Sequence, residues 1–149
     1  MSTGDSRSYF DLSPEHDGGG GSVTPIDGLD AFEIARGLFF RPFYAENISL
    51  NFVTFPPQSG FPAHIHSEEQ VSIVQEGSME ITIGNDTFGV RPGDVIHFPS
   101  DVPHSGMTTD QGCRLIDIFS PPRTGIRDVI ADADPIRDPD VDRWWYDVT

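Results

Sequence analysis

Apolar and polar residues alternate in the central part of the chain, and turn-forming residues interrupt the alternation at short intervals. The run 48–55 shows the pattern clearly, with Ile48, Leu50 and Phe52 on alternate positions. Side chains two residues apart in a strand point to the same face, so this run predicts a half-buried β-strand. Two consecutive prolines, Pro56 and Pro57, end it.

Further strands are expected on both sides of this one. The aromatic run 31–44 predicts a strand that Pro42 limits to its first part or places at a sheet edge. The other expected strands are residues 71–75 and 79–83, joined at Glu76-Gly77, and residues 87–90, 95–98 and 114–119. Turns are expected at residues 84–86 and 91–94, and a short helix within residues 126–133. Short strands with intervening turns indicate an all-β fold, an antiparallel jelly roll or small barrel.

The chain divides into an arm and one domain. Residues 1–24 contain the segment DGGGGS and few apolar positions, so we expect a flexible N-terminal arm. Residues 25–149 are expected to form a single domain, because 149 residues fit one hydrophobic core. Trp144, Trp145 and Tyr146 near the C-terminus are expected to be packing residues.

The net negative charge of the chain excludes some classes of binding partner. The chain has 24 acidic residues against 9 basic ones, for a formal net charge of −15. Such a chain is repelled by nucleic acid and by anionic membranes, so neither is an expected partner. The single cysteine, Cys113, cannot form an intramolecular disulfide, and neither a signal peptide nor a membrane-spanning apolar run is evident. We therefore expect a cytoplasmic protein.

Histidines at close spacing predict a metal site. His64 and His66 are two residues apart, so in a strand both imidazoles face the same side. Gln70 shares their parity if the strand continues, although a local bend would let Glu69 take its place. His104, which follows a PGD turn, is the expected partner from the second half of the site.

These two groups of residues resemble the two motifs of the cupin superfamily. Gly60, His64, His66, Gln70 and Gly77 match the first motif, and Pro92, Gly93, Asp94, Pro99 and His104 match the second. The resemblance extends from about residue 48 to residue 123 and implies the cupin double-stranded β-helix, a jelly-roll barrel. Two departures are the short spacing from Gly60 to the first histidine and Thr108 near the place where an asparagine is common.

Within the superfamily, the chain is most similar to pectin-degradation cupins that linearise unsaturated galacturonate. The shared segments are the two histidines, Gln70-Val71-Ser72, residues 99–104 and residues 116–123. This resemblance implies that His64, His66, Gln70 and His104 bind the metal. It also implies that Asp117, Phe119 and Arg123 line the substrate pocket. Cupin-type polyketide cyclases share much of the pattern.

The expected ligands suggest the chemistry. Three neutral imidazoles and an amide leave a divalent ion with its full charge, and they suit Zn, Ni, Mn or Fe(II). Gln70 cannot accept a proton near neutral pH, so Asp117 is the candidate general base. Asp117 and Phe119 share one face of their strand, and Arg123 offers a forked cation for a substrate carboxylate. The alternative is that Asp117 and Arg123 are ordinary surface residues.

His97 has three open interpretations. It can enter the cavity as an acid that contacts substrate, replace Gln70 as a ligand, or sit in the barrel wall. We include it among the substrate-binding candidates. Cys113 has no histidine close to it in the sequence, so a nucleophilic role is not expected.

The leading functional hypothesis is a non-redox, metal-dependent enzyme that opens and tautomerises a small unsaturated uronate. The net charge of −15 opposes an anionic substrate, which keeps a polyketide cyclase or other tailoring enzyme as the alternative. An Fe(II) dioxygenase and a non-catalytic ligand-binding module are the remaining alternatives. We also expect a homodimer that meets along the aromatic segment from Phe39 to Tyr44.

Overall fold

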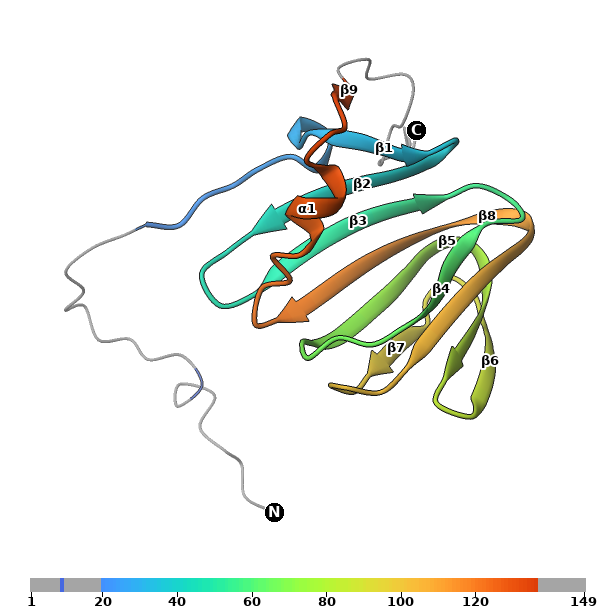
Figure 1. Cartoon of the computed structure of the whole chain (residues 1–149). Coiled ribbons are helices and arrows are strands. Elements are labelled where there is room, and N and C mark those ends of the chain that lie inside the picture. The colour runs from blue at the N-terminus through green and yellow to red at the C-terminus, as the bar shows by residue number, and fades with distance from the viewer. Residues whose placement is uncertain (1–8, 10–19, 137–149) are drawn as a thin grey trace.

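Strands form nearly all of the regular structure (Figure 1). The structure, a computed structural model, describes Tyr9 and residues 20–136. The strands are β1 (Ala31–Ala35), β2 (Leu38–Tyr44), β3 (Ser49–Phe55), β4 (Gly60–His64), β5 (Glu69–Ile83), β6 (Asp86–Val90), β7 (Val95–Phe98), β8 (His104–Ser120) and β9 (Pro135–Ile136). A 3-10 turn, η2 (Ile26–Gly28), precedes them, and α1 (Ile126–Ile130) follows β8. The predicted all-β jelly roll is confirmed, and none of the described helices is long and apolar enough to cross a membrane.

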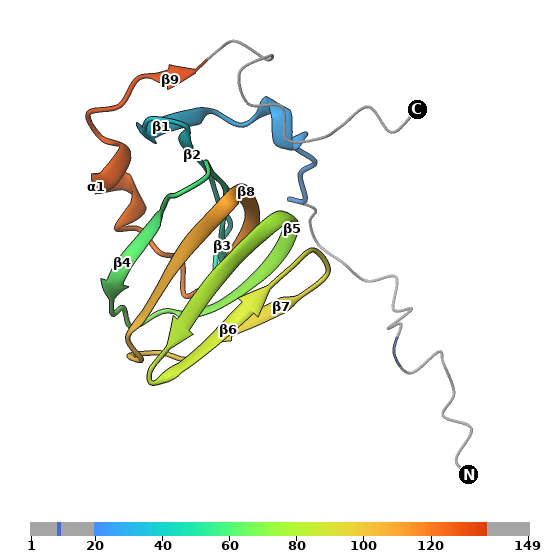
Figure 2. The ribbon, with the colours of Figure 1, turned by 90° about the vertical axis from the view of Figure 1, so that its right-hand side faces the viewer.

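Two long strands, β5 and β8, build both layers of the fold. β5 pairs with β7 through its first residues and with β6 through its last ones. β8 likewise pairs with β4 at its start and with β3 at its end, and β5 and β8 pair with each other along their length. Beyond β3, the sheet continues through β2 and β1 to β9. Figure 2 shows β5 and β8 curving beside each other from one layer into the other.

Gly77 marks the place where β5 bends. The sequence predicted two strands on either side of it, whereas the structure has one strand with register shifts on both sides of Glu76-Gly77. Gly77 has φ +74°, and a Cβ there would lie 1.8 Å from the carbonyl oxygen of Gly112 in β8. Only glycine permits both this conformation and this close approach. The bend lets one strand serve two layers.

The aromatic run 31–44 forms two strands rather than one. Gly37, at φ +76°, lies in the turn between β1 and β2. β1 pairs with β2 only as far as Phe40, so Pro42 lies where β2 has β3 as a neighbour but no partner in β1. The predicted edge position of Pro42 is confirmed. Most of the predicted arm, residues 1–24, and Trp144, Trp145 and Tyr146 lie outside the described residues.

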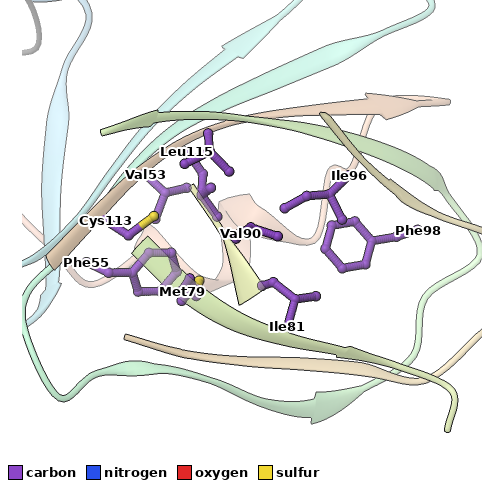
Figure 3. Close-up of a cluster of buried hydrophobic side chains, with 10 residues drawn as sticks. Val53, Phe55, Met79, Ile81, Val90, Ile96, Phe98, Cys113 and Leu115 are labelled. Atoms are coloured by element: carbon purple, nitrogen blue, oxygen red, sulfur yellow. The ribbon is translucent and has the colours of Figure 1, made fainter. Parts of the chain in front are cut away.

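The core fills part of the interior and forms the floor of a cavity. Figure 3 shows side chains from β3, β5, β6, β7 and β8 meeting between the layers. Phe52, Phe55 and Phe98 are all buried. The buried cluster comprises Val53, Phe55, Val74, Met79, Ile81, Val90, Ile96, Phe98, Cys113 and Leu115. Four of these residues, Val53, Phe55, Phe98 and Leu115, also line the cavity described below.

Candidate active site

Three histidines from different parts of the fold converge at one point. His64 ends β4, His104 begins β8, and the two are register partners. His66 lies in the loop between β4 and β5. One ligand atom from each of the three lies within 4.8 Å of the others, a spacing at which they could hold a metal ion. The structure therefore brings together the predicted histidine ligands.

Backbone carbonyls set the protonation of each imidazole. The Nδ1 atoms of His64, His66 and His104 lie 2.8, 3.0 and 3.0 Å from the carbonyl oxygens of Pro62, Glu68 and Val102. A carbonyl oxygen only accepts hydrogen bonds, so each Nδ1 carries the proton and each Nε2 keeps its lone pair. Metal-binding histidines are commonly oriented in this way.

Burial keeps two of these imidazoles neutral. It lowers the pKa of His66, with a smaller contribution from the positive charge of Arg123. It lowers the pKa of His104 to about 4. Within the described residues, the buried Nε2 of His104 has no hydrogen-bond partner. A buried lone pair without a partner is costly, and a metal ion would satisfy it, so the residues present fit a metal.

Gln70 reaches the same point from β5. The strand does not continue from His66 to Gln70, because β4 ends at His64 and β5 begins at Glu69. Gln70 nevertheless faces inward, and its Oε1 lies 3.1 Å from Nε2 of His66. With the proton of His66 on Nδ1, both atoms are acceptors. A cation shared by them would turn this contact into a favourable one, consistent with Gln70 as the fourth ligand.

A chain of hydrogen bonds links Gln70 to Asp117. The Gln70 amide N–H donates to Ser72 Oγ over 2.9 Å, and the Ser72 hydroxyl donates to Asp117 Oδ1 over 2.6 Å. Because Ser72 gives its only proton to Asp117, it must accept from Gln70. This direction turns the amide oxygen of Gln70 toward the histidines.

The environment of Asp117 suits proton transfer. Burial raises the pKa of its carboxyl from 3.8 to about 6, although the Ser72 hydrogen bond and the positive charge of Arg123 act in the opposite direction. A carboxylate with a pKa close to the working pH both accepts and returns a proton readily. The raised pKa of the Asp117 carboxyl therefore suits a group that exchanges protons near neutral pH.

Arg123 lies just beyond β8 and lines the same cavity. Its backbone N–H donates to Ser49 Oγ over 2.9 Å, and its guanidinium carbon lies 5.4 Å from the centroid of the Phe119 ring. Phe119 is fully buried, so its ring is a firm support. Within the described part of the chain, no carboxylate forms an ion pair with Arg123. The guanidinium remains available for an anionic ligand.

One cavity of about 310 Å³ contains most of the predicted site residues. Its polar lining comprises Asn51, His64, Gln70, His104, Asp117 and Arg123. Its apolar lining comprises Phe40, Val53, Phe55, Phe61, Pro62, Phe98, Leu115, Phe119, Ile126 and Val129. A larger cavity of about 550 Å³ lies at the bend of β5 and β8 and contains none of the predicted site residues. We therefore place the candidate site in the smaller cavity.

His97 does not line this cavity, which corrects its assignment as a substrate-binding residue. In β7, Ile96 and Phe98 are buried while Val95 and His97 are exposed, because alternate side chains point to opposite faces. His97 Nε2 lies 2.9 Å from Glu69 Oε2, and the two side chains are 56% and 58% exposed. Glu69 also faces outward, so neither residue takes the place of Gln70.

Sequence reasoning assigned no role to Asn51 or Ser72. Ser72 belonged to the matched segment after the histidines and shares the parity of Gln70, which was a usable signal. Asn51 lay opposite the apolar positions of its strand, where a polar residue suggests solvent. The structure turns Ser49, Asn51 and Val53 inward. Cys113 is buried and its thiol pKa is raised to about 12, in line with the expectation that it is no nucleophile.

The comparisons with known proteins agree on the fold. Residues 51–119 match the family described as the cupin domain. The chain has the cupin jelly-roll fold. An uncharacterized protein of Streptomyces coelicolor is 27% identical over 100 residues, which cover 66% of this chain and 95% of that protein.

Solved cupin structures resemble the chain along most of their length. An RmlC-like cupin from Shewanella frigidimarina has a TM-score of 0.66 at 23% identity, covering 72% of this chain and 96% of that one. KdgF from Halomonas sp. has a TM-score of 0.67 at 21% identity, covering 72% of this chain and 99% of that one. At these identities the likeness shows the cupin fold and leaves the reaction to be argued from the site.

Proposed function

We propose that this cupin is a metal-dependent enzyme that opens the ring of a small unsaturated uronate and tautomerises the product without redox chemistry. The observation that supports this most is the presence of Asp117 and Arg123 in the cavity that is also lined by His64 and His104, two of the three clustered histidines. A base, a carboxylate partner and a metal-binding cluster are the three components that such a reaction needs.

The residues divide the work in this proposal. His64, His66, His104 and Gln70 would hold Zn, Ni, Mn or Fe(II), and the ion would act as a Lewis acid that polarises a substrate oxygen. Arg123 binds the substrate carboxylate, supported by the face of Phe119. Asp117 removes the proton of the anomeric hydroxyl, and the bond between the anomeric carbon and the ring oxygen breaks to give an aldehyde and an enolate. Asp117 then returns the proton to carbon as the enolate becomes a ketone. Ser72 holds the Asp117 carboxylate in place.

The test is the loss of ultraviolet absorbance of an unsaturated galacturonate on addition of metal-loaded protein. Asp117→Asn is expected to lower kcat by about 100-fold or more, which is the usual contribution of a general base. Asp110→Asn, an exposed change on the same strand, is the matched control. No absorbance change with any unsaturated uronate contradicts the proposal.

A second candidate function follows from the apolar lining. Ten of the side chains around the cavity are apolar, and five of these are phenylalanines. Such a wall packs well against an aromatic ring, which favours a polyketide cyclase or related tailoring enzyme. This alternative would be supported if the protein converted an aromatic polyketide acid and converted no uronate. Oxygen uptake with Fe(II) would instead indicate a dioxygenase, and binding without turnover would indicate a ligand-binding module.

A further inference from the structure

Three polar side chains form one row across the inner faces of β5, β8 and β3. Asp117 in β8 pairs with Ser72 in β5 on one side and with Asn51 in β3 on the other. We call Ser72, Asp117 and Asn51 the polar row. The neighbouring row, Val74, Leu115 and Val53, is entirely apolar and buried. The row on the other side, Gln70, Phe119 and Ser49, also contains polar residues, so the polar row lies at the border of the apolar floor.

The two neighbours of Asp117 differ in their hydrogen bonds. Ser72 is fully buried and donates to the Asp117 carboxyl. Asn51 is 2% exposed, and its Oδ1 accepts the backbone N–H of Arg41 over 3.1 Å. Because a backbone N–H can only donate, this contact identifies the oxygen of the amide and leaves its nitrogen on the other side.

The amide nitrogen of Asn51 faces the cavity without a partner. Asn51 lines the cavity, and within the described residues no group accepts its N–H protons. The nitrogen is not among the fully buried atoms that lack a partner, so its N–H protons are open to a molecule that occupies the cavity.

A purely structural role explains only half of this side chain. Pro42, the β2 residue opposite Asn51, lacks an N–H. The side-chain oxygen of Asn51 accepts the backbone N–H of the adjacent residue, Arg41. An aspartate would supply the same acceptor. The structural role therefore leaves the two donor protons beside Asp117 unexplained.

We propose that the Asn51 amide donates a hydrogen bond to a hydroxyl or carbonyl oxygen of the substrate, next to the carbon or hydroxyl that exchanges a proton with Asp117. Arg123 takes the carboxylate in the same cavity. The site then selects carboxylic acids that carry a further oxygen over plain carboxylates. This inference rests on the proposed function for the role of Asp117, but its test is a binding measurement.

The probes are D-galacturonate, which has a carboxylate and hydroxyls, and acetate, which has only the carboxylate. The protein is loaded with Zn and labelled with ¹⁵N, and the side-chain NH₂ signal of Asn51 is identified by its loss in Asn51→Asp. We expect this signal to shift with galacturonate and to stay in place with acetate.

Affinities provide the second readout. Asn51→Asp keeps the acceptor for Arg41 and loses the donor, whereas Asn51→Leu removes both without adding charge. In each variant, the ratio of galacturonate to acetate affinity is expected to fall about tenfold, the worth of one hydrogen bond. Using the ratio cancels the effect of the new charge on carboxylate binding. Asn85→Asp, the same change in an exposed turn, is the control and should leave the ratio unchanged.

The outcomes separate this inference from the proposed function. An Asn51 signal that stays in place with galacturonate, or an unchanged affinity ratio in both variants, overturns the role of Asn51. Failure of the wild-type protein to convert unsaturated uronates contradicts the proposed reaction alone. A shifted signal and a reduced ratio support the role of Asn51 whichever reaction the enzyme catalyses.

Discussion

At the scale of single residues, the pKa values of two groups that line the cavity are shifted in opposite directions. Burial raises the pKa of Asp117 to about 6, so the folded protein takes up this proton more readily than the unfolded chain. Burial lowers the pKa of His104 to about 4, so the folded protein resists this proton. Both shifts act between about pH 4 and 6.5, and their effects on stability oppose each other.

In the metal-free protein, variants of Asp117 and His104 should change how the free energy of unfolding depends on pH, and the two changes should have opposite signs. His104 contributes stability that is fully present above pH 6.5 and is lost as the pH falls toward 4. Asp117 contributes stability that is fully present below pH 3.8 and is lost as the pH rises through 6. Relative to wild type, the free energy of unfolding of Asp117→Asn should therefore fall more steeply on acidification, and that of His104→Asn less steeply.

Urea denaturation between pH 4 and 7 measures these slopes in the presence of a chelator. Comparison with wild type at each pH removes the contribution of the many surface carboxylates, since all three proteins share them. If the free energy of unfolding changes with pH by the same amount in all three proteins, the pKa values of Asp117 and His104 are not shifted as described.

His97 is expected to contribute little to activity. Its pair with Glu69 is exposed to solvent, and exposed ion pairs contribute about 0–1 kcal/mol. His97→Ala should therefore leave kcat, KM and metal content unchanged and shift the free energy of unfolding by less than about 1 kcal/mol. Steady-state kinetics and metal analysis test this. A large loss of activity would contradict the prediction and show that His97 contributes to the site.

At the scale of elements, the bend of β5 decides the geometry of the barrel. Gly77 allows β5 to pass from the layer that contains β7 into the layer that contains β6. The first half of the strand carries Gln70 and Ser72 to the cavity, while the second half contributes Met79 and Ile81 to the core. The site and the core are therefore coupled through one strand.

Gly77→Ala should be strongly destabilising. Its Cβ would lie 1.8 Å from the Gly112 carbonyl oxygen, and φ is +74°. We expect a loss of about 3 kcal/mol or more, since both the backbone conformation and the strand pairing must change. Gly89→Ala in β6 is the control, because a Cβ there meets nothing within 4 Å. Urea denaturation of both variants measures the difference, and equal stabilities would contradict the role of the bend.

At the scale of the whole molecule, a bound ion would join three segments of the chain. His64, His66 and His104 come from β4, the following loop and β8. An ion that binds only the folded protein stabilises it according to its concentration relative to Kd. The expected homodimer stays a prediction, which sedimentation equilibrium can test against the monomer mass of 16.4 kDa.

Metal removal should lower stability in the wild-type protein and not in a ligand variant. With Zn at about 100 times its Kd, the gain in the free energy of unfolding is about 2.7 kcal/mol, and a chelator should abolish it. His104→Ala should lose most of this gain, while His97→Ala should keep it because His97 lies on the outer face. Equal responses of the two variants to Zn would contradict the assignment of the metal site.

Local signals in the sequence determined much of the fold. Alternation with a period of two marked β3 and β7, and the turns around Gly84 and Gly93 were correctly predicted from their residue types. The spacing of His64 and His66, together with His104 from the second motif, also predicted a cluster that the structure contains. The strands, the turns and the pair of His64 and His66 were predictable because they depend on residues close together in the chain.

The tertiary structure alone decided which residues are neighbours across the sheet. Asn51, Ser72 and Asp117 are far apart in the sequence, and the register of β3, β8 and β5 places them in one row. The same registers and the pairing of β7 put His97 on the outer face. Register between distant strands is set by the hydrogen-bond ladder and by packing of the whole barrel, which no short pattern encodes. The sequence by itself therefore determined the cluster of three histidines, and the structure decided what surrounds Asp117.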